Sequence, residues 1–161
     1  MKNVLLLLFL FSCTLSRAQN ARETVEQLWK LTDQYGNSFD KKSVGDEFTI
    51  LLVPTTNEPF RVYDQLKNVK LKPNVVVVGG FGNSGGHGGA MPLGHLKEGF
   101  INKFGSEYLP VWLDPDNAVF KPVKIKGHAI LTITRKGNVL KKVDFGNKID
   151  DFMKAIEPFK N

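Results

Sequence analysis

Histidine and methionine side chains occur at a spacing that could bind a metal ion. The sequence contains three histidines, of which two flank a methionine in the pattern His87-x3-Met91-x3-His95, and the third is His128. Imidazole and thioether groups suit copper, and three imidazoles with one open position suit zinc. The pattern therefore allows a copper or zinc site at these four residues. The simpler interpretation is that there is no cofactor, because a histidine in a glycine-rich loop is usually a solvated loop residue.

A glycine-rich stretch at residues 79–89 could bind phosphate through its backbone. Within it, Gly80 to Gly85 match the pattern G-x-G-x-x-G and follow an apolar, strand-like run. A dinucleotide site would need the motif to open a helix directly and an acidic residue to follow at the distance of a ribose. Residues 86–92 intervene and the acidic residue is missing. We therefore expect a functional loop at the end of a buried strand, but not a nucleotide site.

Acid–base or nucleophilic catalysis has little support in the sequence. Glu58 could pair with His128 as a carboxylate–imidazole couple, and Ser84 lies in the glycine-rich stretch. No G-x-S-x-G pattern accompanies the serine, and nothing fixes the geometry of a triad. Glu58 is better explained as an acidic residue at a helix N-terminus, where the helix dipole stabilises it. The sequence thus predicts no catalytic residue.

The elements that must position these residues alternate between helix-like and strand-like patterns. A first helix is predicted to begin at Asn20 as N-cap, with Val25, Leu28, Trp29 and Thr32 on one face, and to end near Gly36. Further helices are predicted at residues 60–67, 93–104 and 148–157, and strands at 48–53, 75–78, 108–113, 129–134 and 139–145. Short βαβ units predict parallel strands, and the closing hairpin predicts an antiparallel edge.

This order of elements, from Ala21 to Phe159, resembles the thioredoxin-like fold superfamily in its TlpA-like or redoxin branch. Residues 51–60 resemble the segment that leads into the Cys-x-Pro-Cys motif, with Pro59 matching the family's proline. Residues 113–119 resemble its "D-P-D" turn, and residues 126–139 resemble the segment that carries a cis-proline, a strand and a turn. The resemblance implies a three-layer α/β/α sandwich with a mixed sheet, a C-terminal antiparallel hairpin and a terminal helix.

The residues on which this family's redox chemistry depends are replaced. Asn57 and Phe60 stand at the two cysteine positions and Ala129 at the cis-proline position. An amide and a phenyl ring can neither attack nor leave in thiol exchange. The one cysteine, Cys13, lies in the leading apolar run, so removal of that run would exclude thiol–disulfide oxidoreductase activity.

The former active-site end of the domain is instead expected to be a binding groove for a protein or peptide. In a thioredoxin-like sheet, the residues that follow the parallel strands converge at one end. The expected groove comprises Asn57, Glu58, Pro59, Phe60, Phe81, His128 and Ala129. Trp112 and Met91 are further aromatic or apolar candidates for its lining.

Residues 1–18 have the layout of a signal peptide, which leaves residues 19–161 as one domain. Lys2 precedes an apolar stretch at residues 4–15, and small residues stand at Ser16 and Ala18. That stretch is shorter than the roughly 20 residues of a bilayer span, so we expect no transmembrane span after signal removal. The protein is expected to be exported, either periplasmic or secreted. An alternative reads Leu10 to Cys13 as a lipoprotein box with Cys13 as the lipid anchor.

Charge and composition limit the partners. The chain has 22 basic and 16 acidic residues, a formal net charge of +6, but its lysines are scattered and do not alternate with aromatic residues. Nucleic acid is therefore not an expected partner. The hypothesis that best fits the sequence is an exported thioredoxin-like protein without thiol redox activity that acts as a binding or accessory module in the cell envelope. The alternative is a periplasmic copper or zinc carrier, or a metal-dependent enzyme, that uses His87, Met91 and His95.

Overall fold

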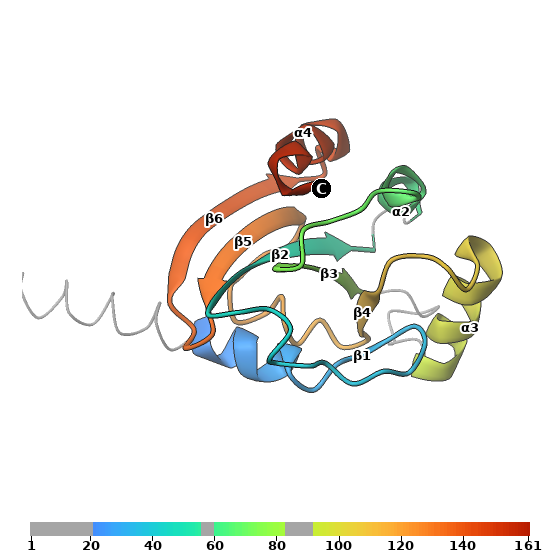
Figure 1. Ribbon diagram of the computed structural model, residues 1–161, viewed down its shortest axis with the longest axis horizontal. Helices are drawn as coiled ribbons and strands as arrows, with labels where there is room; N and C mark the ends of the chain where they lie inside the picture. The colour runs from blue at the N-terminus through green and yellow to red at the C-terminus, as the bar shows by residue number, and fades with distance from the viewer. Residues whose placement is uncertain (1–20, 56–59, 83–91) are drawn as a thin grey trace, which may run out of the picture.

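The computed structural model describes residues 21–55, 60–82 and 92–161, and it has the α/β architecture that the sequence predicts (Figure 1). A helix over residues 21–28 comes first. The remaining elements, in chain order, are β1 (Thr32–Asp33), β2 (Glu47–Pro54), α2 (Arg61–Leu66), β3 (Val75–Gly80), α3 (Leu93–Phe104), β4 (Val111–Asp114), β5 (His128–Thr134), β6 (Val139–Gly146), α4 (Ile149–Ala155) and the 3-10 helix η2 (Glu157–Phe159).

The strands form one mixed sheet in the order β1-β4-β3-β2-β5-β6. The two central pairings, β2 with β3 and β3 with β4, are parallel, which confirms the predicted βαβ units. β5 lies antiparallel to β2, and β6 lies antiparallel to β5, which confirms the C-terminal hairpin. β2 is buried from its second to its seventh residue, as its near-continuous apolar sequence predicts.

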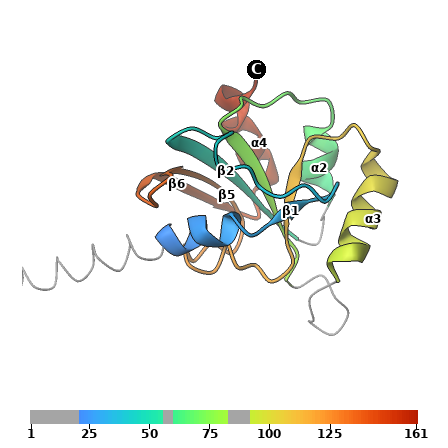
Figure 2. The same ribbon diagram turned by 60° about the horizontal axis from the view of Figure 1, so that its bottom comes forward.

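Both faces of the sheet carry a hydrophobic core, so the fold has three layers. Successive residues of β2 point to opposite faces: Ile50 and Leu52 belong to one core cluster, and Leu51 and Val53 belong to the other. The helix over residues 21–28 and the turns that precede β5 cover the first face. α2, α3 and α4 cover the second face, with α3 beside α2 (Figure 2).

The first helix is shorter than its apolar periodicity predicts. It ends at residue 28, and Thr32 pairs with Leu113 in a short antiparallel strand at the edge of the sheet. The Asp33 carboxylate accepts hydrogen bonds from the backbone N–H groups of Tyr35 (2.9 Å) and Asn37 (2.8 Å). Sheet pairing and this side-chain turn replace the last helical turns that the periodicity predicts.

Helix α3 matches its prediction at both ends. Leu96, Phe100 and Phe104 recur on one face and are buried, and Gly105 follows the helix with a positive φ of 85°. Glycine adopts this backbone conformation without the steric cost that a Cβ would bring. Among the described residues, no helix has the length and apolar character needed to cross a membrane.

Candidate functional site

The candidate site lies at the carboxyl ends of the parallel strands β2 and β3. From there the chain enters residues 56–59 and 83–91, which lie outside the described residues. The predicted site residues Asn57, Glu58, Pro59, His87 and Met91 fall in these two segments. The described residues around them show how this end of the sheet is built and which predicted side chains reach its surface.

Hydrogen bonds fix the points where the chain leaves the strands. Thr55 donates to the Gly80 carbonyl through its backbone N–H (2.7 Å) and its hydroxyl (2.8 Å), which ties the end of β2 to the end of β3. Gly82 N–H donates to the Asn117 side-chain oxygen at 3.1 Å, so the turn after β4 holds the first residues of the glycine-rich stretch. We call Thr55, Gly80, Gly82, Asp114 and Asn117 the strand-end frame.

Asp114 organises this frame as a turn former. Its carboxylate is buried and accepts hydrogen bonds from the backbone N–H groups of Ala118 and Val119, both at 2.8 Å. Its own carbonyl accepts a hydrogen bond from Phe81 N–H at 2.9 Å. Burial raises the pKa of the Asp114 carboxyl, and these N–H bonds offset only part of that increase. The carboxylate oxygens are thus used by the turn itself, as the Asp-Pro-Asp sequence predicts.

Two glycines of the glycine-rich stretch are explained by packing against this turn. A Cβ on Gly80 would lie 2.7 Å from the Asn117 side-chain oxygen, and one on Gly82 would lie 2.5 Å from the Asn117 side-chain nitrogen. Only residues without a side chain allow so close an approach. Part of the G-x-G pattern therefore serves the contact with Asn117.

Phe60 is the predicted groove residue that the structure places on the surface. It immediately precedes α2, its side chain is 37% exposed, and its ring centroid lies 5.9 Å from that of Phe104. The Lys103 ammonium lies 4.8 Å from the Phe60 ring centroid, within the range of a cation–π interaction. The structure thus presents an aromatic ring, held by α3, where the resemblance places a cysteine.

Three other predicted groove residues are core residues, which corrects the sequence-based site. Phe81 is 4% exposed, His128 is 1% exposed and Ala129 is fully buried. Phe81 packs edge-on against Phe100 with centroids 5.8 Å apart, and Ala129 lies opposite Leu52 in the β2–β5 pairing. These three side chains cannot line a groove, because strand pairing and helix packing bury all of them.

The two described histidines do not form an open ligand pair. His95 is exposed on α3, whereas His128 is buried with its ring centroid 5.4 Å from that of Phe152. His128 Nδ1 is hydrogen-bonded to the Gly146 carbonyl at 3.1 Å. Burial lowers the pKa of the His128 imidazole, and this hydrogen bond offsets only part of the decrease. Its polar contact is thus a backbone carbonyl, and the predicted partner Glu58 lies outside the described residues.

Within residues 21–55, 60–82 and 92–161, no group of three or more His, Cys, Asp or Glu side chains could hold a metal ion. The copper or zinc hypothesis depends on His87 and Met91 and remains a prediction.

Sequence reasoning missed Lys103 and Phe104 as neighbours of Phe60. Their positions on α3 follow from the helical pattern, but the contact with the start of α2 depends on how two separate helices pack over β3. The available signal was the Phe100–Phe104 pair at i, i+4, which marks the buried face of α3 beside Lys103.

Comparison with models of protein families and with curated proteins finds no match. Solved structures do match. The N-terminal domain of PilB from Neisseria gonorrhoeae has a TM-score of 0.54 at 13% identity, covering 83% of this chain and 91% of that chain. The reduced form of the same domain from N. meningitidis has a TM-score of 0.52 at 15% identity, covering 82% and 94%.

A third match is the exposed lipoprotein thioredoxin Etrx1 from Streptococcus pneumoniae strain TIGR4. Its TM-score is 0.50 at 15% identity, and the alignment covers 80% of this chain and 96% of that chain. At sequence identities this low, the matches are evidence for the fold and not for a shared function. Together with the mixed sheet and its two helical layers, these matches show that the chain has the thioredoxin-like fold.

Proposed function

We propose that the protein is an exported binding or accessory module of the cell envelope that uses a thioredoxin-like domain without thiol redox chemistry. The observation that carries the proposal is Phe60. An apolar ring stands partly exposed at the start of α2, where the family resemblance assigns a cysteine.

The surroundings of Phe60 suit recognition of a partner. Its ring packs beside Phe104, and the Lys103 ammonium lies 4.8 Å from its centroid, which limits its motion before any partner binds. A pre-positioned aromatic side chain contributes apolar contact area at a low cost in conformational entropy. The strand-end frame supports the same end of the sheet through backbone hydrogen bonds. We infer that a protein or peptide partner covers Phe60.

Export rests on the signal-peptide layout of residues 1–18. A structurally similar protein, the pneumococcal Etrx1, is described as an exposed lipoprotein, which is compatible with an envelope location for this fold. We propose a periplasmic or secreted protein, with lipid attachment through Cys13 as the alternative processing route.

A capture experiment with matched variants tests the proposal. Ile101 on α3 has the same exposed fraction as Phe60, 37%, and provides the control. Protein immobilised as wild type, Phe60→Asp and Ile101→Asp is exposed to envelope extract, and bound proteins are quantified. We expect one partner that wild type and Ile101→Asp retain and Phe60→Asp releases. Equal retention by all three would contradict a partner site at Phe60.

Two further assays distinguish this function from thiol redox catalysis and from metal transport. Insulin reduction in the presence of dithiothreitol should show no rate above background, and catalysis would contradict the redox-free assignment. Thermal melts with Cu(I), Cu(II) and Zn(II) test the metal alternative, since a ligand at a hundredfold excess over its Kd adds about 2.7 kcal/mol of stability. A metal-dependent increase in Tm that His87→Ala/His95→Ala abolishes would favour the carrier.

A further inference from the structure

A cleft of about 1060 Å³ lies at the amino ends of β3 and β4, at the opposite end of these strands from the strand-end frame. Three segments that precede strands of the sheet enclose it: the loop before β2, the connection from α2 to β3 (residues 67–73), and the connection from α3 to β4 (residues 105–110). Apart from Phe104, which also packs against Phe60, its lining takes no part in the function proposed above.

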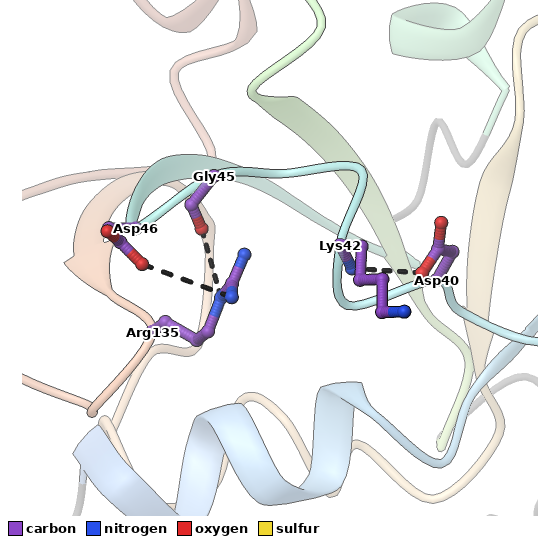
Figure 3. Close-up of polar contacts among 5 residues, drawn as sticks. All are labelled: Asp40, Lys42, Gly45, Asp46 and Arg135. Carbon is purple, nitrogen blue, oxygen red and sulfur yellow. Dashed lines mark hydrogen bonds and ion pairs between the residues drawn. The ribbon is translucent and has the colours of Figure 1, made fainter.

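The loop before β2 is fixed on both sides of the cleft residues Ser43 and Val44 (Figure 3). On one side, the Asp40 carboxylate accepts a hydrogen bond from Lys42 N–H at 2.9 Å. On the other, Arg135 Nε donates to the Gly45 carbonyl at 3.1 Å, and its guanidinium lies 3.9 Å from the Asp46 carboxylate. The loop is thereby anchored to the β5–β6 turn.

The connection from α2 to β3 is anchored to the C-terminal segment. Lys72 N–H donates to the Phe159 carbonyl at 3.0 Å, and Asn161 N–H donates to the Lys70 carbonyl at 2.9 Å. These bonds flank an antiparallel bridge between Leu71 and Lys160. Residues 70–72 therefore form an extended wall that is held in place.

The connection from α3 to β4 is held by two polar side chains. Gln34 donates to the Leu109 carbonyl at 2.9 Å and accepts from Val111 N–H at 2.8 Å. The Tyr108 hydroxyl donates to the Tyr63 carbonyl at 2.5 Å. All three walls are thus fixed by hydrogen bonds within the domain, so little ordering would accompany binding.

The cleft joins an apolar surface to a cationic wall. Phe39 and Trp112 lie with ring centroids 4.5 Å apart and both line it, as does Leu109. Sequence reasoning assigned Trp112 to the former active-site end, but the residue lies in the first half of β4 and lines this opposite cleft. Phe39 is buried at 7% exposed, whereas Trp112 is only partly buried, so Trp112 is the aromatic side chain that the cleft presents. A partly covered aromatic side chain is typical of recognition surfaces.

The cationic wall consists of Lys67, Lys70 and Lys72, all of which are exposed. Within the described part of the chain, none of the three forms an ion pair, and the lining carries one acidic side chain, Glu107. The Lys72 ammonium donates to the Pro158 carbonyl at 2.7 Å, which positions the charge without neutralising it. The lysines leave a net positive charge beside the apolar surface.

We propose that this cleft binds an extended acidic segment of a partner protein. Lys70 and Lys72 are alternate residues of an extended wall, so their side chains leave it on one side about 7 Å apart. Carboxylates at alternate positions of an extended peptide have the same spacing, and the residues between them would face Trp112. A concave cleft admits such a peptide, whereas a flat bilayer surface would not reach its aromatic residues.

Peptide titration with two charge-reversal variants tests this proposal. The probe is a short synthetic peptide of alternating Glu and Leu, and binding is followed by amide and indole chemical shifts. We expect the largest shifts at Val44, Leu109 and the Trp112 indole. Lys70→Glu/Lys72→Glu should weaken binding roughly tenfold, because the two proposed charge pairs become repulsive.

The matched control is Lys126→Glu/Lys141→Glu. Both lysines are exposed and outside the cleft, and the change in net charge is the same. This variant should bind like wild type. Equal weakening by both variants would show non-specific attraction and overturn the proposal. The proposal would also be overturned if the chemical shifts lay outside the cleft or if the peptide did not bind. Binding to phosphatidylglycerol vesicles in place of the peptide would overturn it as well. The chemical shifts are mapped on the wild-type protein, so the test of where the peptide binds does not depend on how well the variants fold.

Discussion

Burial separates side chains that the sequence places together. Phe60, Phe81, His128 and Ala129 were all expected at one binding groove, yet only Phe60 lies on the surface of the described structure. Successive strand residues alternate between faces, and both faces of this sheet are covered. Residue type and spacing could therefore predict at which end of the sheet these residues lie. They could not predict which of its side chains the helices cover.

His128 should make folding stability depend on pH. Its imidazole is buried, so its pKa in the folded protein lies below the ordinary value of 6.5. As pH falls through about 6.5, the unfolded chain binds a proton that the folded protein does not. Stability is therefore lost between that pH and the lower folded pKa, with a slope of at most about 1.4 kcal/mol per pH unit.

Urea denaturation across this pH range checks the His128 expectation. His128→Leu should flatten the dependence, whatever its effect on stability at neutral pH. His95→Ala, at an exposed position on α3, should leave the dependence unchanged. An unaltered slope in His128→Leu would show that another group is responsible.

Asp114 should be the more important of the two aspartates in its turn. Asp114→Asn replaces one of the two accepting oxygens with an NH2 group, which leaves the N–H of Ala118 or Val119 without its acceptor and should cost about 2 kcal/mol of unfolding free energy. Asp116→Asn, at an exposed position, should change stability by less than about 0.5 kcal/mol. Chemical denaturation measures both variants, and equal effects would contradict the role assigned to Asp114.

At the scale of elements, local sequence patterns predict the bounds of helices and strands well where no tertiary strand pairing competes with the local structure. The helix at residues 93–104 and the C-terminal hairpin match their predictions because apolar period, glycine and turn residues all agree. The first helix was predicted to reach Gly36, but residues 32–33 pair with β4 instead. A two-residue edge strand has no periodicity of its own, so the sequence carried no signal for it.

Glycines on different elements should respond oppositely to alanine. Gly80→Ala at the end of β3 should destabilise by about 1–3 kcal/mol, because its Cβ would meet Asn117 and Phe120 within 2.8 Å. Gly99→Ala within α3 meets nothing within 4 Å and should stabilise by about 0.5–1 kcal/mol. Thermal melts distinguish the two, and a neutral Gly80→Ala would contradict the packing role of the strand-end frame.

At the scale of the whole molecule, the order of elements was sufficient to predict the thioredoxin-like sandwich, because short βαβ units and a closing hairpin allow few topologies. The cleft at the amino ends of β3 and β4 was not predictable in this way. It joins residues as distant in sequence as Phe39, Lys70 and Leu109, and each lies in a connection whose path depends on tertiary hydrogen bonds.

We propose that this domain recognises a partner through Phe60 in place of thiol chemistry. Site-specific photo-crosslinking in intact cells tests it most directly, with a benzoylphenylalanine at position 60 and, as control, at the equally exposed position 101. If Phe60 contacts a partner, the probe at position 60 should give a discrete cross-linked protein, and the probe at position 101 should give none or much less of it. Equal cross-linking at both positions, or none at position 60, would contradict it.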